Sequence, residues 1–394
     1  MISNEMLNLG KKRSVIRDIF EYGKIRAKEI EADNVYDFSI GNPSIPAPAC
    51  VNESIIDLVK NEDSILLHGY TSAQGDLNVR KTISDYINNT YDTNLCADNI
   101  YMTVGAAASL SISLKALAVP GDEFIIFTPF FPEYRVFIES SGGTPVIVES
   151  NKKDFQIDIK KFTEAITPKT KAIIINSPNN PSGVIISEEN IKELCAILNQ
   201  KSEEYGHPIY LISDEPYREL VYDDTKVPYL TKYYKNTFVC YSFSKSLSLP
   251  GERIGYIVVS NEMDNSKDVY AAVCGAGRAL GYVCAPSLFQ RVVAKCIGQT
   301  ADISIYKKNR DILYDGLTKL GFECVKPDGA FYLFVKAMEE DANAFCEVAK
   351  KYELLLVPAD SFGCPGYVRI SYCVKTEQII NSMPAFEKLA KEYK

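Results

Sequence analysis

The chain has 394 residues, of which 46% are hydrophobic, enough for a large core and for two domains. Lysine and arginine total 43 against 51 acidic residues, and the net charge of -8 with interspersed signs excludes the basic patch that a nucleic-acid-binding protein needs. The sequence contains no apolar run of about eighteen residues and no apolar segment typical of a signal peptide, so we expect no contact with a membrane.

The cysteines and histidines narrow the chemistry further. The eleven cysteines form no CxxC pair and no metal-ligand spacing, which predicts reduced, mostly buried thiols, a cytoplasmic location and no metal site. Only two histidines occur, His68 and His207, which disfavours mechanisms that need a histidine base. Lysine, tyrosine and carboxylate groups remain as the candidates for catalysis.

The predicted elements alternate along the chain. Helical periodicity occurs over residues 14–31, 50–60, 76–91, 105–118, 187–204, 286–319, 341–352 and 376–392. Short apolar runs typical of buried strands occur at 100–104, 122–129, 144–150, 171–178, 208–216, 237–244 and 254–260. This alternation predicts an α/β fold with a mostly parallel sheet flanked by helices.

The pattern changes after residue 286. One long helix is followed by short strands at 330–336, 353–358 and 367–372, interleaved with two more helices, which indicates a smaller α+β unit. The N-terminal helix is expected to pack with this unit. We therefore predict a large cofactor-binding domain over residues 42–285 and a small domain built from both chain ends, residues 1–41 and 286–394.

In open α/β sheets, ligands bind at the carboxyl ends of the strands, and several candidate groups follow the predicted strands there. Gly105, Ala106 and Ala107 open a helix whose free N–H groups suit a phosphate, or they form a tightly packed helix start. The ring of Phe131 suits stacking on a flat heterocycle, or it belongs to the core. Asn180 either donates to a ligand hydroxyl or builds a turn.

The next two strands end in ionisable groups. Asp214 follows an apolar strand, where its carboxylate needs a cationic partner unless it only caps a helix. In "YSFSKSLSLPGERIGY", Ser242 and Arg253 suit a dianion, and Lys245 is a potential amine nucleophile whose pKa burial and nearby positive charge would lower.

A phosphate cradle, a stacking ring, a desolvated carboxylate, an asparagine and a lysine amine together fit pyridoxal 5'-phosphate. Lys245 would form a Schiff base with the cofactor aldehyde, and Asp214 would keep the ring nitrogen protonated so that the ring can accept electrons from the substrate. Tyr217 and Asn180 could hydrogen-bond the ring hydroxyl.

Four motifs, "SPNNPSG", "SDEPYREL", "SFSKSLSLPGERIGY" and "YVRISY", resemble in order and spacing those of class I/II aminotransferases, fold-type-I pyridoxal-phosphate enzymes of the aspartate aminotransferase type. The resemblance covers residues 39–372. It implies the same roles for Lys245, Asp214, Asn180, Tyr217 and the stacking Phe131. It also implies phosphate contacts from Ala106, Ala107, Ser242 and Arg253, and it makes Arg369 the clamp for the substrate α-carboxylate.

The resemblance also implies a homodimer with a shared active site. "HGYTSAQGDLNVR" resembles the segment whose tyrosine, here Tyr70, reaches the cofactor phosphate of the neighbouring subunit, although a surface turn would also explain it. Gly41 and Asn42 resemble the segment that closes over the substrate. Arg278 falls near the position of a second, partner-derived arginine in dicarboxylate-specific relatives, with a surface arginine as the alternative.

The sequence thus predicts an aminotransferase that moves the amino group of an L-amino acid to a 2-oxo acid, expected to be 2-oxoglutarate, by a ping-pong mechanism. The donor stays open between an aspartate-like and an aromatic amino acid. A C–S β-lyase that uses the same lysine and aspartate is one alternative. A cofactor-free binding protein on the same scaffold is another, but it would not need Lys245, Asp214 and Arg369 together.

Overall fold

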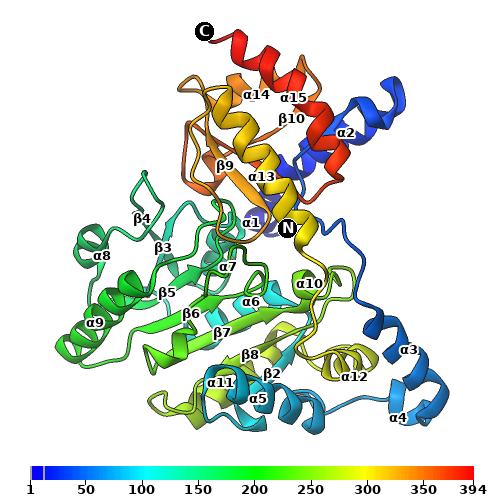
Figure 1. The fold of residues 1–394 in the computed structure, drawn as a ribbon. Helices are drawn as coiled ribbons and strands as arrows, with labels where there is room; N and C mark the ends of the chain where they lie inside the picture. The colour runs from blue at the N-terminus through cyan, green and yellow to red at the C-terminus, as the bar shows by residue number, and fades with distance from the viewer. Residues whose placement is uncertain (1, 12–13) are drawn as a thin grey trace.

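The computed structural model describes residues 2–11 and 14–394, so residues 1, 12 and 13 of the predicted 1–41 segment lie outside the described residues. The large domain is built on a seven-stranded sheet of order β2-β8-β7-β6-β5-β3-β4 (Figure 1). Its strands in chain order are β2 (Ile100–Thr103), β3 (Glu123–Thr128), β4 (Thr144–Glu149), β5 (Thr170–Asn176), β6 (Tyr210–Asp214), β7 (Thr237–Ser242) and β8 (Gly255–Val259). The run from β7 to β4 is parallel, and only β8 is antiparallel to its two neighbours, which confirms the mostly parallel sheet.

Helices cover both faces of this sheet because successive strand residues point to opposite sides. On β5, Ala172 and Ile174 pack in the core under α6 (Ala106–Leu117), while Ile173 and Ile175 pack under α9 (Glu188–Tyr205). The helix α9 begins after Ser187, whose side chain accepts from a first-turn N–H, and ends at the left-handed Gly206. The other helices of this part are α3 (Ala49–Asn61), α4 (Ser64–His68), α5 (Leu77–Tyr91), α7 (Glu133–Ser140), α8 (Ile159–Ala165), α10 (Phe243–Ser246), α11 (Ser266–Leu280) and α12 (Ser287–Lys295).

The small domain combines the two chain ends, as predicted, and lies above the large sheet in Figure 1. The short strand β1 (Tyr36–Asp37) pairs in parallel with β10 (Leu354–Leu355), which ties the N-terminal segment to the C-terminal part. A three-stranded antiparallel sheet follows, formed by β11 (Val357–Pro358), β12 (Tyr367–Ser371) and β9 (Tyr332–Lys336). Its helices are α1 (Asn4–Lys11), α2 (Val15–Ile30), α13 (Ser304–Lys319), α14 (Ala342–Lys350) and α15 (Thr376–Lys391).

The prediction of one long helix over residues 286–319 is wrong. Two helices, α12 and α13, are separated there by a loop that contains Gly298 in the left-handed region, with φ of 78°. In the same loop, the backbone N–H of Ala301 donates to the carbonyl of Ser246 at 2.8 Å. These tertiary contacts break a helical periodicity that continues through the sequence. The domain boundaries at residues 41/42 and 285/286 remain predictions.

Within residues 2–11 and 14–394, no helix is long and apolar enough to cross a membrane. All eleven cysteines are free. The described residues also contain no group of three or more His, Cys, Asp or Glu side chains arranged to hold a metal ion.

We expect Phe238→Ala to destabilise the large domain. Phe238 is 0% exposed near the start of β7, which lies between β6 and β8, and its ring meets Tyr210 edge-on at 5.8 Å. Removing such a ring leaves a cavity and costs about 3–5 kcal/mol in the free energy of unfolding. Urea unfolding under reversible conditions measures the loss, with Phe238→Leu as the milder control. A loss below about 1 kcal/mol in the alanine variant would contradict this packing role.

Candidate active site

The carboxyl ends of β5, β6 and β7 open into a cavity of about 950 Å³, which includes space open to solvent. The large domain provides Ala106, Ala107, Leu110, Phe131, Asn176, Asn180, Asp214, Pro216, Tyr217, Ser242, Ser244, Lys245, Pro250 and Arg253. The small domain provides Ile16, Gly41, Tyr332 and Arg369. Most of the predicted site residues therefore meet in one pocket.

Lys245 lies on the short helix α10, directly after β7, with its amine inside the pocket. Its Nζ donates to the carbonyl of Gly41 at 2.8 Å and lies 5.3 Å from the centre of the Phe331 ring. Burial lowers the pKa of this amine to about 8, and the positive charges of Arg253 and Arg369 act in the same direction. With this pKa, roughly a tenth of the amine is neutral at pH 7, far more than for an ordinary lysine, and the neutral form is the nucleophile.

Asp214 is the last residue of β6 and is 4% exposed. Its Oδ2 accepts a short hydrogen bond from the hydroxyl of Tyr134 on α7, while its Oδ1 has no partner. Burial raises the pKa of the carboxyl to about 7, although the Tyr134 hydrogen bond acts against this rise. The site thus contains a buried acceptor that is ready for an N–H or a cation.

Arg369 on β12 is 2% exposed and reaches the pocket from the small domain. Its Nη1 donates to Oδ1 of Asn180 at 3.2 Å and its Nη2 to the carbonyl of Ser39 at 2.5 Å, but its Nε has no partner. Burial lowers the pKa of the guanidinium, and the ring of Tyr332 lies 4.7 Å from its centre. A charged donor that is buried and incompletely paired favours a carboxylate ligand.

Tyr217 and Asn180 are held by contacts on either side of the pocket. The hydroxyls of Tyr217 and Tyr332 lie 2.9 Å apart, and burial raises the pKa of Tyr217 well above its ordinary value. The backbone N–H of Asn180 donates to Oδ1 of Asn176 at 2.7 Å, and Asn176 in turn donates to the carbonyl of Asp214 at 2.9 Å. These bonds fix the ends of β5 and β6 relative to each other.

The predicted phosphate site lies at the start of α6. Gly105 precedes this helix with φ of 98°, and a Cβ atom there would come within 2.8 Å of Nη2 of Arg253. The backbone angle therefore favours glycine, and a Cβ there would also require the guanidinium of Arg253 to move. Ala106 and Ala107 start the helix, where the first N–H groups are free for an anion, and Ser242 lines the same pocket.

Four predicted residues do not line this pocket: Gly105, which directly precedes the lining residue Ala106, and three others. Tyr70 is 98% exposed, in the loop after α4. Arg278 is exposed on α11, and Asn42 is exposed next to Gly41 without lining the cavity. Within the described chain, none of the three is brought to the site.

Sequence reasoning missed Tyr332 and Ile16, both of which line the pocket. Tyr332 lies in an apolar strand of the small domain and Ile16 in an amphipathic helix, so each pattern indicates only a core position. A Cβ on Gly41 would come within 2.0 Å of the Tyr332 hydroxyl, so the two residues are fitted to each other. No signal in the sequence could have paired these distant segments.

The residues present fit pyridoxal 5'-phosphate. The unpaired Oδ1 of Asp214 matches a protonated ring nitrogen, the amine of Lys245 matches an aldehyde, and the α6 start with Arg253 matches a phosphate. Phe131 lines the pocket beside this group and meets Tyr134 edge-on at 5.7 Å.

Comparison with known proteins gives the class. Residues 33–383 match the family model "Aminotransferase class I and II", and the chain belongs to this family. It is 32% identical to a probable aspartate aminotransferase of Methanocaldococcus jannaschii, covering 99% of this chain and 100% of that protein. It is 27% identical to aromatic-amino-acid aminotransferase 2 of Thermococcus litoralis, covering 97% and 96%. A crystal structure of an amino transferase from Eubacterium rectale, 60% identical, superposes with a TM-score of 0.98 over 100% of this chain and 99% of that one.

The protein is therefore an aminotransferase with the fold of aspartate aminotransferases. The α/β fold and the class predicted from the four motifs are both confirmed.

The cofactor-free protein should lose stability relative to Asp214→Asn as the pH rises from about 4 to about 7. The raised pKa means that folded Asp214 keeps a proton in this window, whereas the unfolded chain, with an ordinary pKa near 3.9, loses it. The proton on Asp214 therefore stabilises the folded state below about pH 4, and this stabilisation is lost as the pH rises to about 7. The asparagine variant does not titrate, so its stability does not contain this pH dependence. The free energy of unfolding of each protein is measured at pH 5 and at pH 8. Between these pH values, we expect the wild type to lose about 2–4 kcal/mol relative to Asp214→Asn. A difference independent of pH would show that Asp214 has no raised pKa.

Proposed function

We propose that this aminotransferase binds pyridoxal 5'-phosphate through Lys245 and moves the amino group of an L-amino acid to a 2-oxo acid, expected to be 2-oxoglutarate, by a ping-pong mechanism. The observation that carries the proposal is a pair of unpaired buried atoms in one pocket, Oδ1 of Asp214 and Nε of Arg369. One is an acceptor and the other a charged donor, and the amine of Lys245 lines the same cavity. A ring nitrogen and a substrate α-carboxylate would satisfy both atoms.

Each residue then has a task. When bound, the cofactor supplies an electron sink for the substrate Cα bond that breaks. Arg369 would hold the α-carboxylate, and Asn180, bonded to it, would keep the guanidinium in place. The amine of Lys245, with its lowered pKa, would take the Cα proton and return it elsewhere, as a general base and then acid. Asp214 would neutralise the charge of the ring nitrogen, and Tyr217 and Asn180 would donate to the ring hydroxyl.

The identity of the amino-acid donor stays open between two classes of side chain, aromatic and aspartate-like. Among the residues that line the pocket, the cationic ones are Lys245, Arg253 and Arg369, and all three already have tasks. An aromatic donor would need no further cation and would meet Ile16 and Leu110. An aspartate-like donor would need a cation from elsewhere, such as Arg278 of a partner subunit. Relatives of this chain carry names of both kinds.

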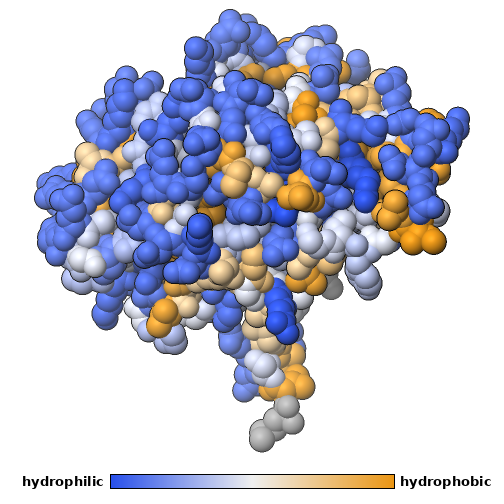
Figure 2. Space-filling model, turned by 90° about the horizontal axis from the view of Figure 1, so that it is seen from below, coloured by the Kyte–Doolittle hydropathy of each residue, from blue (hydrophilic) through white to orange (hydrophobic). Residues whose placement is uncertain are grey.

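A homodimer is part of the proposal. Exposed apolar side chains gather on the segments around Tyr70, including Ile56 (54% exposed), Ile65 (82%), Leu66 (67%) and Leu77 (60%). Apolar atoms form an exposed area at the right of Figure 2, the side on which α3 and α4 lie in Figure 1. Water-exposed apolar area of this kind favours contact with a second copy, which would bring Tyr70 to the neighbouring site.

The eleven free cysteines support a cytoplasmic location.

Visible absorption spectroscopy of the purified protein tests the chemistry. With pyridoxal phosphate, we expect an absorption band from cofactor bound to Lys245, which specific amino acids bleach without any 2-oxo acid present. Lys245→Ala should lose the band and multiple turnover while keeping its fold, and Lys267→Ala, an exposed lysine on α11, should behave as wild type. Turnover retained in Lys245→Ala would refute the assignment. Pyruvate and ammonia released from cysteine or cystathionine would identify the β-lyase instead, and the absence of a band would favour a cofactor-free binding protein.

Mixed dimers test the shared site. Tyr70→Phe alone should weaken binding of the cofactor about 10- to 100-fold, because a hydrogen bond to a charged phosphate is lost. Co-expressing Tyr70→Phe chains with Lys245→Ala chains should restore activity, because one site of each hybrid then combines Lys245 of one chain with Tyr70 of the other. Differently tagged chains allow the hybrid to be isolated and assayed with saturating and limiting cofactor. A hybrid no better than the Tyr70→Phe parent at limiting cofactor would show that Tyr70 does not act across an interface.

A further inference from the structure

The Tyr70 loop, residues 69–76 between α4 and α5, displays an almost fully exposed ring from a backbone that is held in place (Figure 1). The carbonyl of Gln74 accepts the N–H of Met102 on β2 at 2.8 Å. The carbonyl of Ala73 accepts the N–H of Cys284, in the stretch after α11, at 3.3 Å. The exposure of Tyr70, which is 98%, is therefore not the exposure of a loosely attached loop.

Gln290 on α12 is the side chain that joins the two ends of this loop. It is 0% exposed. Its Oε1 accepts the backbone N–H of Asp76 at 2.8 Å, and its Nε2 donates to Oγ1 of Thr71 at 3.2 Å. The same Nε2 donates to the carbonyl of Ala285 at 2.6 Å. One buried amide thus reaches from the residue directly after Tyr70 to the residue that caps α5.

The partners of Gln290 require an amide at this position. The N–H of Asp76 can only donate and the carbonyl of Ala285 can only accept, so the amide oxygen must face the first and the nitrogen the second. A methionine of similar length would leave both backbone groups without this partner. The loop also lies directly against the amide, because a Cβ on Gly75 would come within 3.0 Å of Oε1 of Gln290 and within 2.2 Å of Cγ of Met102.

The same amide holds a second segment that the proposed dimer would use. Its partner Ala285 ends the stretch that follows α11, and the last turn of α11 carries Arg278, the cation that an aspartate-like donor would need from a partner subunit. The large apolar side chains exposed in and next to this stretch are Leu280, Tyr282 and Val283. Gln290 therefore connects two surface segments that both expose apolar area.

We propose that Gln290 is a positioning residue that fixes the Tyr70 loop for the cofactor site of a partner subunit. The inference rests on the proposed function, because only a dimer with a shared site gives Tyr70 a task. Gln290 does not line the pocket of its own chain, so its influence on the cofactor passes through the loop. A loop that is already ordered loses less conformational entropy when it makes its contact, which strengthens binding.

A double-mutant cycle tests this role. Gln290→Met removes all three hydrogen bonds, and we expect about tenfold weaker binding of pyridoxal phosphate, because the loop must then be ordered on binding. In a Tyr70→Phe background the same change should have no more than about a twofold effect, since the hydrogen bond that the loop presents is already absent. A Gln290→Met effect of equal size in both backgrounds would mean that the glutamine does not act through Tyr70.

Asn236→Leu is the matched control. Asn236 is 2% exposed and directly precedes β7, at the end of the sheet away from the pocket, where its amide bonds to the carboxylate and the backbone N–H of Asp264. This variant also loses a buried amide, so it should lose stability, but its affinity for the cofactor should match that of the wild type. A loss of affinity in the control as large as in Gln290→Met would attribute both to general destabilisation.

Hybrid dimers separate an effect across the interface from an effect within one chain. When a Tyr70→Phe chain pairs with a Lys245→Ala chain, the working site combines Lys245 of the first with Tyr70 of the second. Gln290→Met should weaken cofactor binding about tenfold in the chain that supplies Tyr70 and have little effect in the other chain. The absorption band of cofactor bound to Lys245 reports on this site alone. Equal effects from the two placements would overturn the positioning role.

Thr71→Val is the second variant if Gln290→Met fails to fold. It keeps the shape of the side chain and removes the hydroxyl that accepts from Gln290. We expect about threefold weaker binding, the factor that one hydrogen bond contributes, and again only from the chain that supplies Tyr70. An unchanged affinity would overturn the proposal.

Hydrogen exchange provides a check that needs no cofactor. In the cofactor-free protein, the backbone N–H groups of residues 71–76 should exchange faster in Gln290→Met than in the wild type, while those of β7 should not change. Equal exchange in the loop would show that the glutamine does not hold it.

Failure of the proposed function has a different signature. If the wild type gives no absorption band with pyridoxal phosphate, the proposed function and the positioning role fall together. If Tyr70→Phe binds the cofactor as tightly as the wild type, the shared site and the positioning role fall while the cofactor assignment stands. If only the Gln290→Met results fail, the positioning role falls alone.

Discussion

A carboxyl group sealed at the end of β6 is the constraint on which the rest of the site depends. Asp214 is 4% exposed, and only one of its oxygens is bonded, to Tyr134. Leaving a buried polar atom unpaired costs about 1–3 kcal/mol, a cost that an apolar side chain at this position would avoid. The strand registers that place Asp214 beside Asn176 and Cys240 nevertheless keep it in place. A ligand with a charged N–H offsets this cost, so the fold is prepared for one.

The second constraint is that the site belongs to both domains. Three hydrogen bonds between residues that line the pocket cross from one domain to the other: Lys245 to Gly41, Asn180 to Arg369, and Tyr217 to Tyr332. Each joins a group from the ends of β5, β6 or β7 to a group from the chain termini. The position of the small domain therefore determines where the α-carboxylate donor lies relative to the amine. This is a physical reason for the return of both chain ends to one small domain, and for the short parallel pair of β1 and β10 that holds them together.

The residue pattern alone predicted the parts of the site that follow a strand, whereas Arg369 and Gly41 were predicted from the family resemblance. Asp214, Asn180, Ser242 and Lys245 each follow an apolar run, and parallel strands bring their carboxyl ends to one edge by geometry alone. Tyr332 could not be predicted, because a tyrosine in a buried strand of another domain is read as core. The break between α12 and α13 depends on Gly298 and on the contact of Ala301 with Ser246, and both are tertiary features. The helical periodicity of the sequence therefore could not predict this break.

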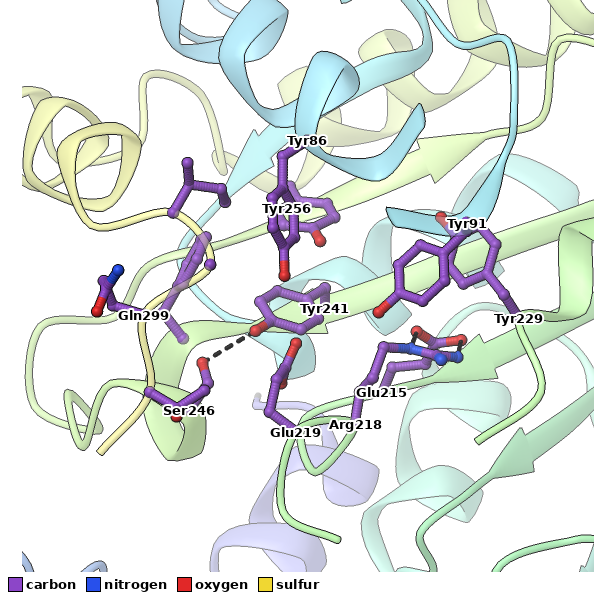
Figure 3. Close-up of a pocket in the computed structure, with 14 residues that line it drawn as sticks. Tyr86, Tyr91, Glu215, Arg218, Glu219, Tyr229, Tyr241, Ser246, Tyr256 and Gln299 are labelled. Carbon is purple, nitrogen blue, oxygen red and sulfur yellow. Dashed lines mark hydrogen bonds and ion pairs between the residues drawn. The ribbon is translucent and has the colours of Figure 1, made fainter. Parts of the chain in front are cut away.

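The two unpaired acids differ in what their surroundings can offer. Asp214 ends β6 and Glu219 lies in the segment that follows it, and burial raises the pKa of both to about 7. Asp214 faces an open pocket, so a ligand can provide the missing charge, whereas Glu219 faces a second cavity in which the one cation among the described lining residues, Arg218, is paired with Glu215 (Figure 3). The pocket side of this segment is therefore the side suited to binding a ligand with a charged N–H.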